Sequence, residues 1–324
     1  MAASGLDFEK QFEELERLIA ELKKPEKRAE AAAQGIDLEA QVAQLEAELQ
    51  RMLKKQYSLL TPWEKTLVAR HKDRPYALDY IRMVFDDFLE LYGDRLSGND
   101  EAVVGGLAVL TGEPVVVIGQ QKGRDLKERQ RRNFGSAHPE GFRKALRLAR
   151  LAQKFRKPLI SLVDTPAAAA DLAAEERGIS EAIARNLKEF AVLKVPIVVV
   201  IIGEGGSGGA LGMAIGDRVL MLEHSVYSVI PPEGCAAILW RDREKAPEAA
   251  KALNLTAQGA LALGIIDEVL PEPVGGAHRD PAGAAATLKE ALVRHLAALR
   301  HVPPDTLVAS RLQRLRSIGF WTEA

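Results

Sequence analysis

The sequence contains little cysteine, few aromatic residues and no excess of either charge. Cys235 is the single cysteine among 324 residues, which excludes an internal disulfide framework and a multi-cysteine zinc site. It also fits a reducing compartment. The 44 basic and 45 acidic residues give a formal net charge of −1. The chain as a whole therefore has no electrostatic attraction to nucleic acid or to a membrane.

Long apolar runs are also missing. No run approaches the roughly 18 residues that a membrane-spanning helix needs. The first residues lack the charged-then-apolar pattern of an export signal. We therefore expect a cytoplasmic protein without membrane contact. The histidines, His138, His224 and His278 among them, are scattered without metal-ligand spacing, so we expect no metal site in this chain.

Amphipathic helical patterns fill the N-terminal region. Apolar residues recur at helical spacing over residues 6–22 and again over 36–52, with a polar, Ala-rich connector between them. This pattern predicts a helical hairpin, and we assign residues 1–56 to an assembly arm. Farther on, Thr61, Pro62 and Glu64 form a capping box that starts another helix.

The next helical pattern is longer. Apolar spacing over residues 78–92 predicts one amphipathic helix, which Gly93 would end.

From about residue 100 the chain alternates between strand and helix patterns. The predicted strands cover residues 102–110, 114–119, 158–164, 195–203, 218–222, 226–230 and 264–271. The predicted helices cover residues 141–155, 174–193, 208–215, a region between 231 and 263, and 287–299. This alternation predicts an α/β domain with a sheet covered on both faces. Ligands of open α/β sheets bind beyond the carboxyl ends of the strands.

The most informative stretch is the glycine-rich segment that follows the apolar run 195–202. Gly203-Glu-Gly-Gly-Ser-Gly-Gly209 places five glycines within seven residues, just before a short helical pattern. Glycines allow a ligand to approach the backbone closely, and amides at a helix start can bind an anion or a developing oxyanion. A tight turn that needs glycine only for packing is the simpler interpretation, but the number of glycines exceeds that need.

Three other motifs compete for this segment. Gly203 to Gly208 satisfies the dinucleotide fingerprint, with Glu223 twenty residues after Gly203, so an oxidoreductase remains an alternative. The short spacing to the next strand argues against it. A phosphate-binding P-loop would need a Gly-Lys-Ser or Gly-Lys-Thr that is missing. Ser207 fits the Gly-x-Ser-x-Gly elbow of hydrolases, for which Asp267 and His278 could supply the acid and the base.

A basic stretch follows the predicted strand 114–119. Six positive charges lie between Lys122 and Arg132, and Gly123 permits a tight turn between Lys122 and Arg124. A solvated helix face is the ordinary interpretation of such a run. Lys122 and Arg124 lie where the strand ends, which favours a phosphorylated ligand such as coenzyme A. Phe134 is the one aromatic residue nearby, so this stretch has few side chains on which nucleic-acid bases could stack.

Several blocks occur in a fixed order along the chain: RPYALDY at 74–80, GQQKGR at 119–124, RRNFG at 131–135, PEGFRKALR at 139–147, AEERG at 174–178, SEAIARN at 180–186, GEGGSGGA at 203–210, PEGCA at 232–236, ILW at 238–240, and PEP with GGAHR between 271 and 279. Taken together, these blocks resemble the alpha subunit of bacterial acetyl-CoA carboxylase carboxyltransferases over nearly the whole chain. The resemblance implies a crotonase fold, a spiral of ββα units, over residues 57–300. It leaves residues 301–324 as a basic C-terminal tail.

The resemblance also implies a reaction and its partners. The family transfers a carboxyl group from carboxybiotin, held on a biotin carboxyl carrier protein, to acetyl-CoA, which gives malonyl-CoA for fatty acid synthesis. It works as an α₂β₂ heterotetramer whose beta subunit carries the zinc, and a separate biotin carboxylase loads the biotin.

By this resemblance the amides of Gly205 and Gly206 form an oxyanion hole for the ureido oxygen of biotin, while Gly208 and Gly209 support the loop. The residues expected to line the substrate site are Lys122, Gly123, Arg124, Asp164, Thr165, Pro166, Glu204 and Ser207.

One loop departs from the family pattern. After Asp164-Thr165-Pro166 the family continues Gly-Ala-Tyr-Pro-Gly, whereas this chain has Ala167-Ala-Ala-Ala-Asp171, and Ile179 replaces the usual Gln. Alanine adopts positive φ poorly, so we expect a different loop backbone. The departure leaves a second hypothesis open, a catalytically impaired subunit kept for assembly or regulation.

Overall fold

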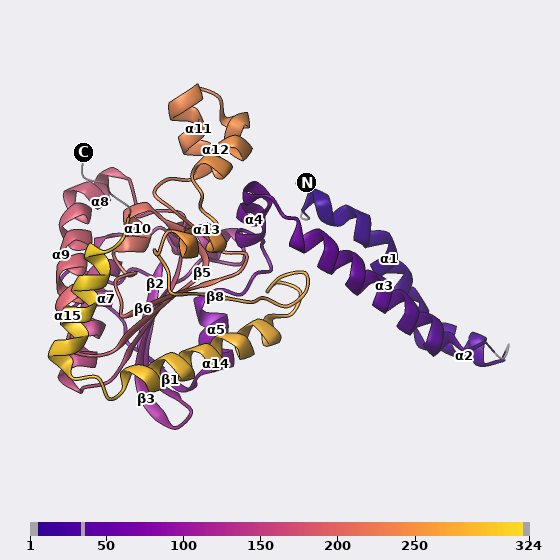
Figure 1. The fold of residues 1–324 in the computed structure, drawn as a ribbon, viewed down its shortest axis with the longest axis horizontal. Coiled ribbons are helices and arrows are strands. Elements are labelled where there is room, and N and C mark those ends of the chain that lie inside the picture. Colours follow the sequence, from indigo (N-terminus) through magenta and orange to yellow (C-terminus); the bar gives the residue numbers. More distant parts are fainter. Residues whose placement is uncertain (1–5, 34–35, 320–324) are drawn as a thin grey trace.

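The computed structural model describes residues 6–33 and 36–319, and its centre is one mixed sheet of eight strands (Figure 1). The strands are β1 (Asp86–Glu90), β2 (Val103–Leu110), β3 (Glu113–Gln120), β4 (Leu159–Thr165), β5 (Ile197–Gly206), β6 (Arg218–Leu222), β7 (Val226–Ser228) and β8 (Glu268–Leu270). Their order is β1-β2-β3-β4-β5-β6-β8, and β7 pairs with the end of β5.

The direction of pairing changes at β3. The first three strands are antiparallel, whereas β3, β4, β5, β6 and β8 run parallel to their neighbours. The carboxyl ends of β3, β4 and β5 therefore lie next to one another. This placement brings the segments after residues 120, 165 and 206 to one edge of the sheet, as the sequence predicted.

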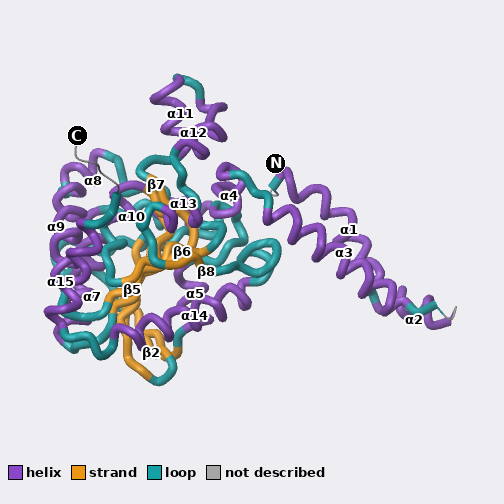
Figure 2. Tube along the Cα trace, viewed as in Figure 1, coloured by secondary structure: helices purple, strands orange, loops and turns teal. Residues whose placement is uncertain are grey.

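Helices cover both faces of the sheet, as Figure 2 shows with helices in purple around the orange strands. In the C-terminal two thirds of the chain the helices are α6 (Leu126–Arg131), η2 (Asn133–Gly135), α7 (Pro139–Lys154), α8 (Leu172–Glu176), α9 (Ile179–Val192), α10 (Ser207–Leu211), α11 (Pro232–Trp240), η3 (Arg243–Lys245), α12 (Ala246–Ala252), α13 (Ala257–Ala262), α14 (Pro281–Leu299) and α15 (Pro304–Arg316). In β5, Val199 and Ile201 contribute to the core beneath α7 and α9, while Val198 and Val200 contribute to the core beneath α14.

The N-terminal segment forms an arm that projects from the α/β body (Figure 1). Its helices are η1 (Asp7–Glu9), α1 (Lys10–Leu22), α2 (Pro25–Ala33) and α3 (Leu38–Ser58), followed by α4 (Pro62–Ala69) and α5 (Ala77–Val84). Helices α1 and α3 pack together as a hairpin, as predicted. The expected connector contains helix α2, because its alanines are strong helix formers. Residues 1–5 of the predicted arm lie outside the described residues.

Three predicted helices end early or are divided, and the predicted helix 287–299 begins earlier, at Pro281, where Asp280 caps it. The pattern over residues 78–92 is not one helix: α5 ends at Val84, and β1 follows as an edge strand. Two consecutive aspartates, Asp86 and Asp87, disfavour helix at this point. The sequence pattern did not indicate the role of Gly106 in β2. A Cβ at this position would lie 1.9 Å from the carbonyl oxygen of Leu89, so glycine is needed for β1 to pair with β2.

Glycine also ends or divides the other two helices. The predicted helix 174–193 is split at Gly178, which has φ +80°, and the predicted helix 208–215 ends at Leu211 before Gly212. Within the described ranges, no helix combines the length and the apolarity needed to cross a membrane.

The segment expected to be a basic tail contains helix α15. The side chain of Arg311 is fully buried there: its guanidinium pairs with Asp217 (Nη2 to Oδ2, 2.7 Å) and donates to the carbonyl oxygens of Phe190, Leu193 and Val195. This arginine therefore anchors α15 to α9 and to the segments before β5 and β6, so the predicted basic tail is in part a packed helix. Residues 320–324 of the predicted tail lie outside the described part of the chain.

Candidate active site at the end of strand β5

The glycine-rich segment forms the end of β5 and the turn into α10. Gly205 and Gly206 are the last residues of β5, and Ser207 starts α10 with φ 51°, a left-handed conformation that is uncommon for serine. A Cβ on Gly206 would lie 1.9 Å from the carbonyl oxygen of Pro166, and one on Gly209 would lie 2.4 Å from the carbonyl carbon of Ala167. Both positions therefore require glycine for the backbones to approach.

The other two glycines of the turn are less constrained. A Cβ on Gly208 would make an ordinary contact, 3.6 Å from Ile183 Cδ1. A Cβ on Gly205 would lie 2.7 Å from the ring of Tyr227. In the sheet, Gly205 is in register with Thr165 of β4 and with Tyr227 of β7. The predicted residues Thr165, Pro166, Gly205 and Gly206 thus lie side by side.

A network of buried charges lies beneath the turn. Lys122 Nζ is 2.7 Å from Asp164 Oδ1 and 2.8 Å from Glu204 Oε2, and Arg70 Nε donates to Glu204 Oε1 at 2.6 Å. The amide of Glu204 donates to Asp164 Oδ1 at 2.9 Å. A Cβ on Gly203 would lie 2.4 Å from this same carboxylate oxygen, so glycine makes room for it. Lys122, Asp164 and Glu204 tie the ends of β3, β4 and β5 together, and their contact with substrate stays a prediction.

The pKa values of this network reflect the pairing. Burial would raise the pKa of Glu204, but the charges of Lys122 and Arg70 outweigh it and lower that pKa to about 2. Burial would lower the pKa of Lys122, but Asp164 and Glu204 outweigh it and raise that pKa above its ordinary value. Glu204 and Lys122 therefore stay ionised at neutral pH, while burial raises the pKa of Asp164 against the opposing charge of Lys122.

Sequence reasoning missed three residues of this region. Arg70 reaches Glu204 and also pairs with Glu233 of α11. Gln120 is fully buried: its Nε2 donates to the carbonyl oxygen of Gly209 at 2.7 Å, and its Oε1 accepts from the amide of Asp164 at 3.2 Å. Gln120 belongs to the GQQKGR block and Glu233 to the PEGCA block, which could have indicated them, whereas Arg70 carries no local signal.

The predicted residues Gly123 and Arg124 shape the loop after β3. A Cβ on Gly123 would lie 2.3 Å from the amide nitrogen of Arg129, so the turn needs glycine. The Arg124 guanidinium stacks 4.0 Å from the ring centroid of Tyr76 and donates to the carbonyl oxygens of Lys72 and Arg74. It also pairs with Asp79. Arg124 thus fixes the segment before α5.

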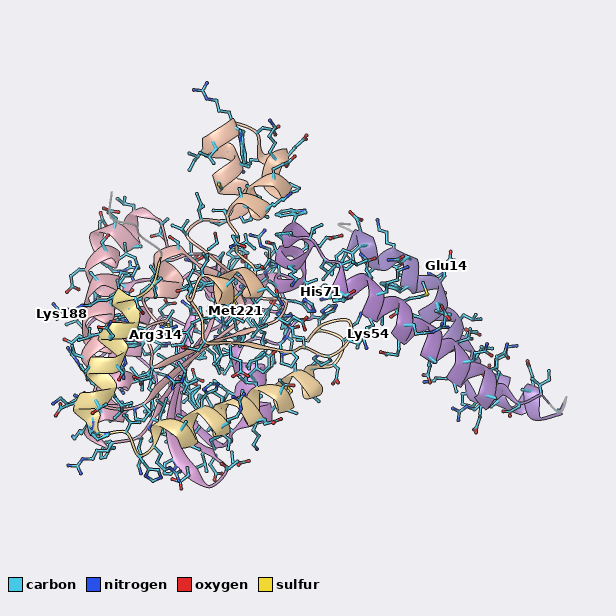
Figure 3. The ribbon with its side chains drawn as sticks, viewed as in Figure 1. Glu14, Lys54, His71, Lys188, Met221 and Arg314 are labelled. Atoms are coloured by element: carbon cyan, nitrogen blue, oxygen red, sulfur yellow. The ribbon has the colours of Figure 1, made fainter. Side chains whose placement is uncertain are left out.

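An apolar groove of about 370 Å³ opens beside Ser207 and Gly208. Leu211, Tyr227 and Ile265 line it, and Arg314 of α15 borders it. Figure 3 labels Arg314 on α15. Burial raises the pKa of Tyr227 to about 12, against the opposing charge of Arg314, so the phenol remains neutral. The groove gives an apolar ligand access to the turn.

The Ala-rich loop has an ordinary backbone. None of residues 167–171 has positive φ. The hydroxyl of Thr165 donates to the carbonyl oxygen of Ala167 at 2.6 Å, and the amide of Ala169 donates to the carbonyl oxygen of Ala137 at 2.9 Å. Asp171 caps α8 by accepting from the amide of Ala174. Alanine therefore fits this loop without backbone strain.

The three residues considered for a hydrolase triad, Ser207, Asp267 and His278, do not lie together in the structure. Asp267 accepts from the amide of Val219 and pairs with Arg314, while His278 lies beside Glu9 and Tyr57 at the base of the arm. Among the described residues, no hydrogen bond joins Ser207 to a histidine. The turn offers backbone amides rather than an activated nucleophile.

A histidine cluster that the sequence did not reveal lies where the arm meets the body. Potential ligand atoms of Glu9, His71 and His278 lie within 4.8 Å of one another. Figure 3 labels His71 in this region. The Glu9 carboxylate accepts from Tyr57 Oη at 2.5 Å and from Arg279 Nε at 3.1 Å, so it already has cationic and neutral donors. We infer that this cluster holds the N-terminal arm against the α/β body.

Solved structures of a decarboxylase and of a transcarboxylase share this fold. A Pseudomonas malonate decarboxylase hetero-tetramer in complex with coenzyme A matches with a TM-score of 0.58 and 19% identity, over 74% of this chain and 94% of that one. Transcarboxylase 12S, solved with methylmalonyl-coenzyme A, matches with a TM-score of 0.57 and 21% identity, over 70% of this chain and 42% of that one. The fold is thus the crotonase-like fold of carboxyltransferases, as predicted.

The sequence comparisons identify the family. Residues 5–319 match the model of the acetyl co-enzyme A carboxylase carboxyltransferase-like family, and the chain belongs to this family. Proteins named acetyl-coenzyme A carboxylase carboxyl transferase subunit alpha are 54% identical in Geobacter metallireducens (98% of each chain covered) and 52% identical in Thermus thermophilus (98% of this chain and 99% of that one). The predicted function, a transferase of the acetyl-CoA carboxylase carboxyltransferase type, is confirmed. The alternative of a dinucleotide-binding oxidoreductase is wrong.

Proposed function

We propose that this chain, as an alpha subunit, transfers a carboxyl group from carboxybiotin on a separate biotin carboxyl carrier protein to acetyl-CoA. The product, malonyl-CoA, enters fatty acid biosynthesis, and a biotin carboxylase reloads the carrier. The observation that carries this proposal is the β5–α10 turn, where Gly206 and Gly209 permit backbone contacts that no other residue allows. Family membership supports the same reaction.

The chemistry explains why a backbone turn suits this reaction. The bond between the carboxyl carbon and the ureido nitrogen breaks, and negative charge moves to the ureido oxygen. A methyl proton of acetyl-CoA passes to that nitrogen, and the resulting carbanion forms the new carbon–carbon bond with the released carboxyl carbon, which gives the carboxylate of malonyl-CoA. Fixed amide donors aimed at a developing oxyanion lower the barrier without a side-chain nucleophile. We assign this role to the amides of Gly205 and Gly206.

The buried charges support the turn. Lys122, Asp164 and Glu204 fix the ends of three adjacent strands, so the amides at the end of β5 are held before substrate arrives. Gln120 holds the carbonyl oxygen of Gly209. Lys122, Gly123 and Arg124 thus help to build the site, and their contact with coenzyme A stays a prediction.

We further propose a beta subunit that completes the site in an α₂β₂ assembly and carries the zinc. Large apolar side chains are exposed: Leu211 (42%) and Val229 (74%) line the groove beside the turn, and Ile238 (72%) and Leu239 (63%) lie on another helix. The last two belong to α11, which projects from the body with α12 (Figure 1). Such a surface is typical of a protein–protein contact.

The Ala-rich loop motivates a second candidate, a subunit that assembles without catalysing transfer. The ordinary backbone of residues 167–171 favours tolerated variation instead. One experiment separates the two. The chain is co-expressed with its beta partner, and malonyl-CoA-dependent carboxylation of free biotin is followed in the purified complex. We expect complex formation with turnover. A stable complex without turnover would support the second candidate, and no complex would overturn the proposed assembly.

A further inference from the structure

A second cavity, unrelated to the glycine turn, is lined mainly by arginines. This groove of about 550 Å³ lies between α7, α9 and the turn after β1, and its arginines are Arg95, Arg143, Arg147, Arg150 and Arg185. Arg143, Arg147 and Arg150 are spaced four and three residues apart on α7, which puts them on one face of that helix. We call this cavity the arginine groove.

Carboxylates compensate only part of this charge. Arg185 Nε pairs with Glu181 at 2.6 Å, and Arg150 Nη2 pairs with Glu189 at 2.9 Å. Arg143 is 3.8 Å from a Glu140 oxygen that also accepts from Arg177 at 2.9 Å. Asp94 also lines the groove, but its carboxylate already accepts hydrogen bonds from the amides of residues 96–98 and from the hydroxyl of Ser97.

Arg95 and Arg147 are the uncompensated pair. Within the described ranges, neither takes part in an ion pair. Arg147 donates to the carbonyl oxygens of residues 91, 92 and 93, and Arg95 also donates to that of Tyr92. Burial, together with the nearby charge of Arg95, lowers the pKa of Arg147. The two guanidiniums repel each other, and a bound anion would relieve that repulsion.

We propose that the arginine groove binds the phosphoryl groups of a nucleotide-sized ligand. Guanidinium forks match phosphate oxygens in bidentate geometry, which makes arginine the usual side chain for such anions. The groove volume lies within the range of small-molecule sites. None of its lining residues belongs to the glycine turn or to the buried network, so the site stands apart from the proposed carboxyl transfer.

The test is isothermal titration of the full-length chain at fixed ionic strength. Pyrophosphate, ADP and coenzyme A are the probes, and citrate is the carboxylate comparison. We expect saturable binding of pyrophosphate and of at least one nucleotide, with a Kd below about 1 mM. The ADP and coenzyme A titrations tell which nucleotide carries the phosphoryl groups. The double variant Arg95→Gln/Arg150→Gln removes one of the two uncompensated guanidiniums and one surface ion pair, and it spares Arg147, which holds the turn after β1. It should bind about tenfold more weakly.

The matched control is Arg300→Gln, which removes an arginine of similar exposure paired with Glu113 at 3.1 Å in another part of the surface. This control should bind like the wild type. The proposal is overturned if no phosphoryl probe binds saturably, if citrate binds as tightly, or if the double variant binds unchanged. If pyrophosphate binds but neither ADP nor coenzyme A does, the proposal of a nucleotide-sized ligand is overturned.

Discussion

Two buried polar clusters hold this molecule together in different ways. The network under the glycine turn links three adjacent strands, and its Lys122, Asp164 and Glu204 side chains are 12%, 2% and 9% exposed. The cluster at the base of the arm joins Glu9 and Glu16 to His278 and Arg279, with Arg279 23% and Glu16 35% exposed. Both combine carboxylates with cations.

The difference lies in what each cluster connects. Strands β3, β4 and β5 are parts of one core, so loss of a charge in the network under the turn affects the sheet itself. Glu9 and Arg279 are 270 residues apart and connect two regions that each have their own apolar contacts. We therefore infer that the first cluster determines the geometry of the site, while the second determines the position of the arm.

The largest expected effect is on stability. Replacement of Lys122 by Met leaves Asp164 buried without its cation and leaves Glu204 with Arg70 alone. We expect the free energy of unfolding to fall by about 3–5 kcal/mol, the usual cost of breaking a buried ion pair. Urea unfolding measures this change. Lys72→Met is the control, because the Lys72–Asp73 pair is more than half exposed and should contribute almost nothing. Equal effects of the two variants would contradict the comparison.

A smaller, pH-dependent effect is expected at the arm. Burial alone would raise the pKa of Glu9, but hydrogen bonds from His278 and Tyr57 and the charge of Arg279 lower it from 4.5 to about 2. A pKa depressed by folding stabilises the protein above the unfolded-state pKa, and this stabilisation is lost as the pH falls through the folded-state pKa.

The stability difference between wild type and Glu9→Gln isolates this carboxylate, because the other acids are common to both proteins. We expect that difference to be about 2 kcal/mol at pH 6 and to shrink steadily between pH 5 and pH 3. Denaturant unfolding at several pH values measures it. A difference that stays constant over this pH range would show that the Glu9 contacts do not stabilise the arm.

The smallest effect is expected in the Ala-rich loop. Replacement of Ala167 by Gly restores the residue usual in the family, but the loop backbone already has no positive φ for glycine to relieve. We expect the turnover of the complex to change by less than about threefold, which is below 1 kcal/mol. A large gain in the rate of biotin carboxylation would mean that the alanines impair the site.

Local sequence patterns predicted much of the sheet and little of its buried charge network. Strands such as β5 and β6 are continuous apolar runs, and the number of glycines at 205–209 was by itself enough to indicate a close backbone approach. The edge strand β1 was missed because its pairing depends on Gly106, which lies beyond the segment itself.

The partners in the charge network were harder to predict. Arg70 reaches Glu204 across 134 residues and Glu233 across 163, and no spacing rule links such positions. Lys122 illustrates the same difficulty: a lysine at a strand end suggested a phosphate ligand, whereas the fold places two carboxylates within 3 Å of its ammonium group. Only the folded chain reveals which charges are already paired.

The central claim, that backbone contacts at the β5–α10 turn build the catalytic site, is tested most directly by two glycine variants in the complex with the beta partner. In Gly206→Val, the new Cβ would lie 1.9 Å from the carbonyl oxygen of Pro166, so the backbone must move. In Gly208→Ala, the new Cβ would lie an ordinary 3.6 Å from Ile183 Cδ1. The readout is the rate of malonyl-CoA-dependent biotin carboxylation in correctly assembled complexes. We predict a loss of at least about 10²-fold for Gly206→Val and nearly wild-type turnover for Gly208→Ala. Wild-type turnover of Gly206→Val would contradict the account.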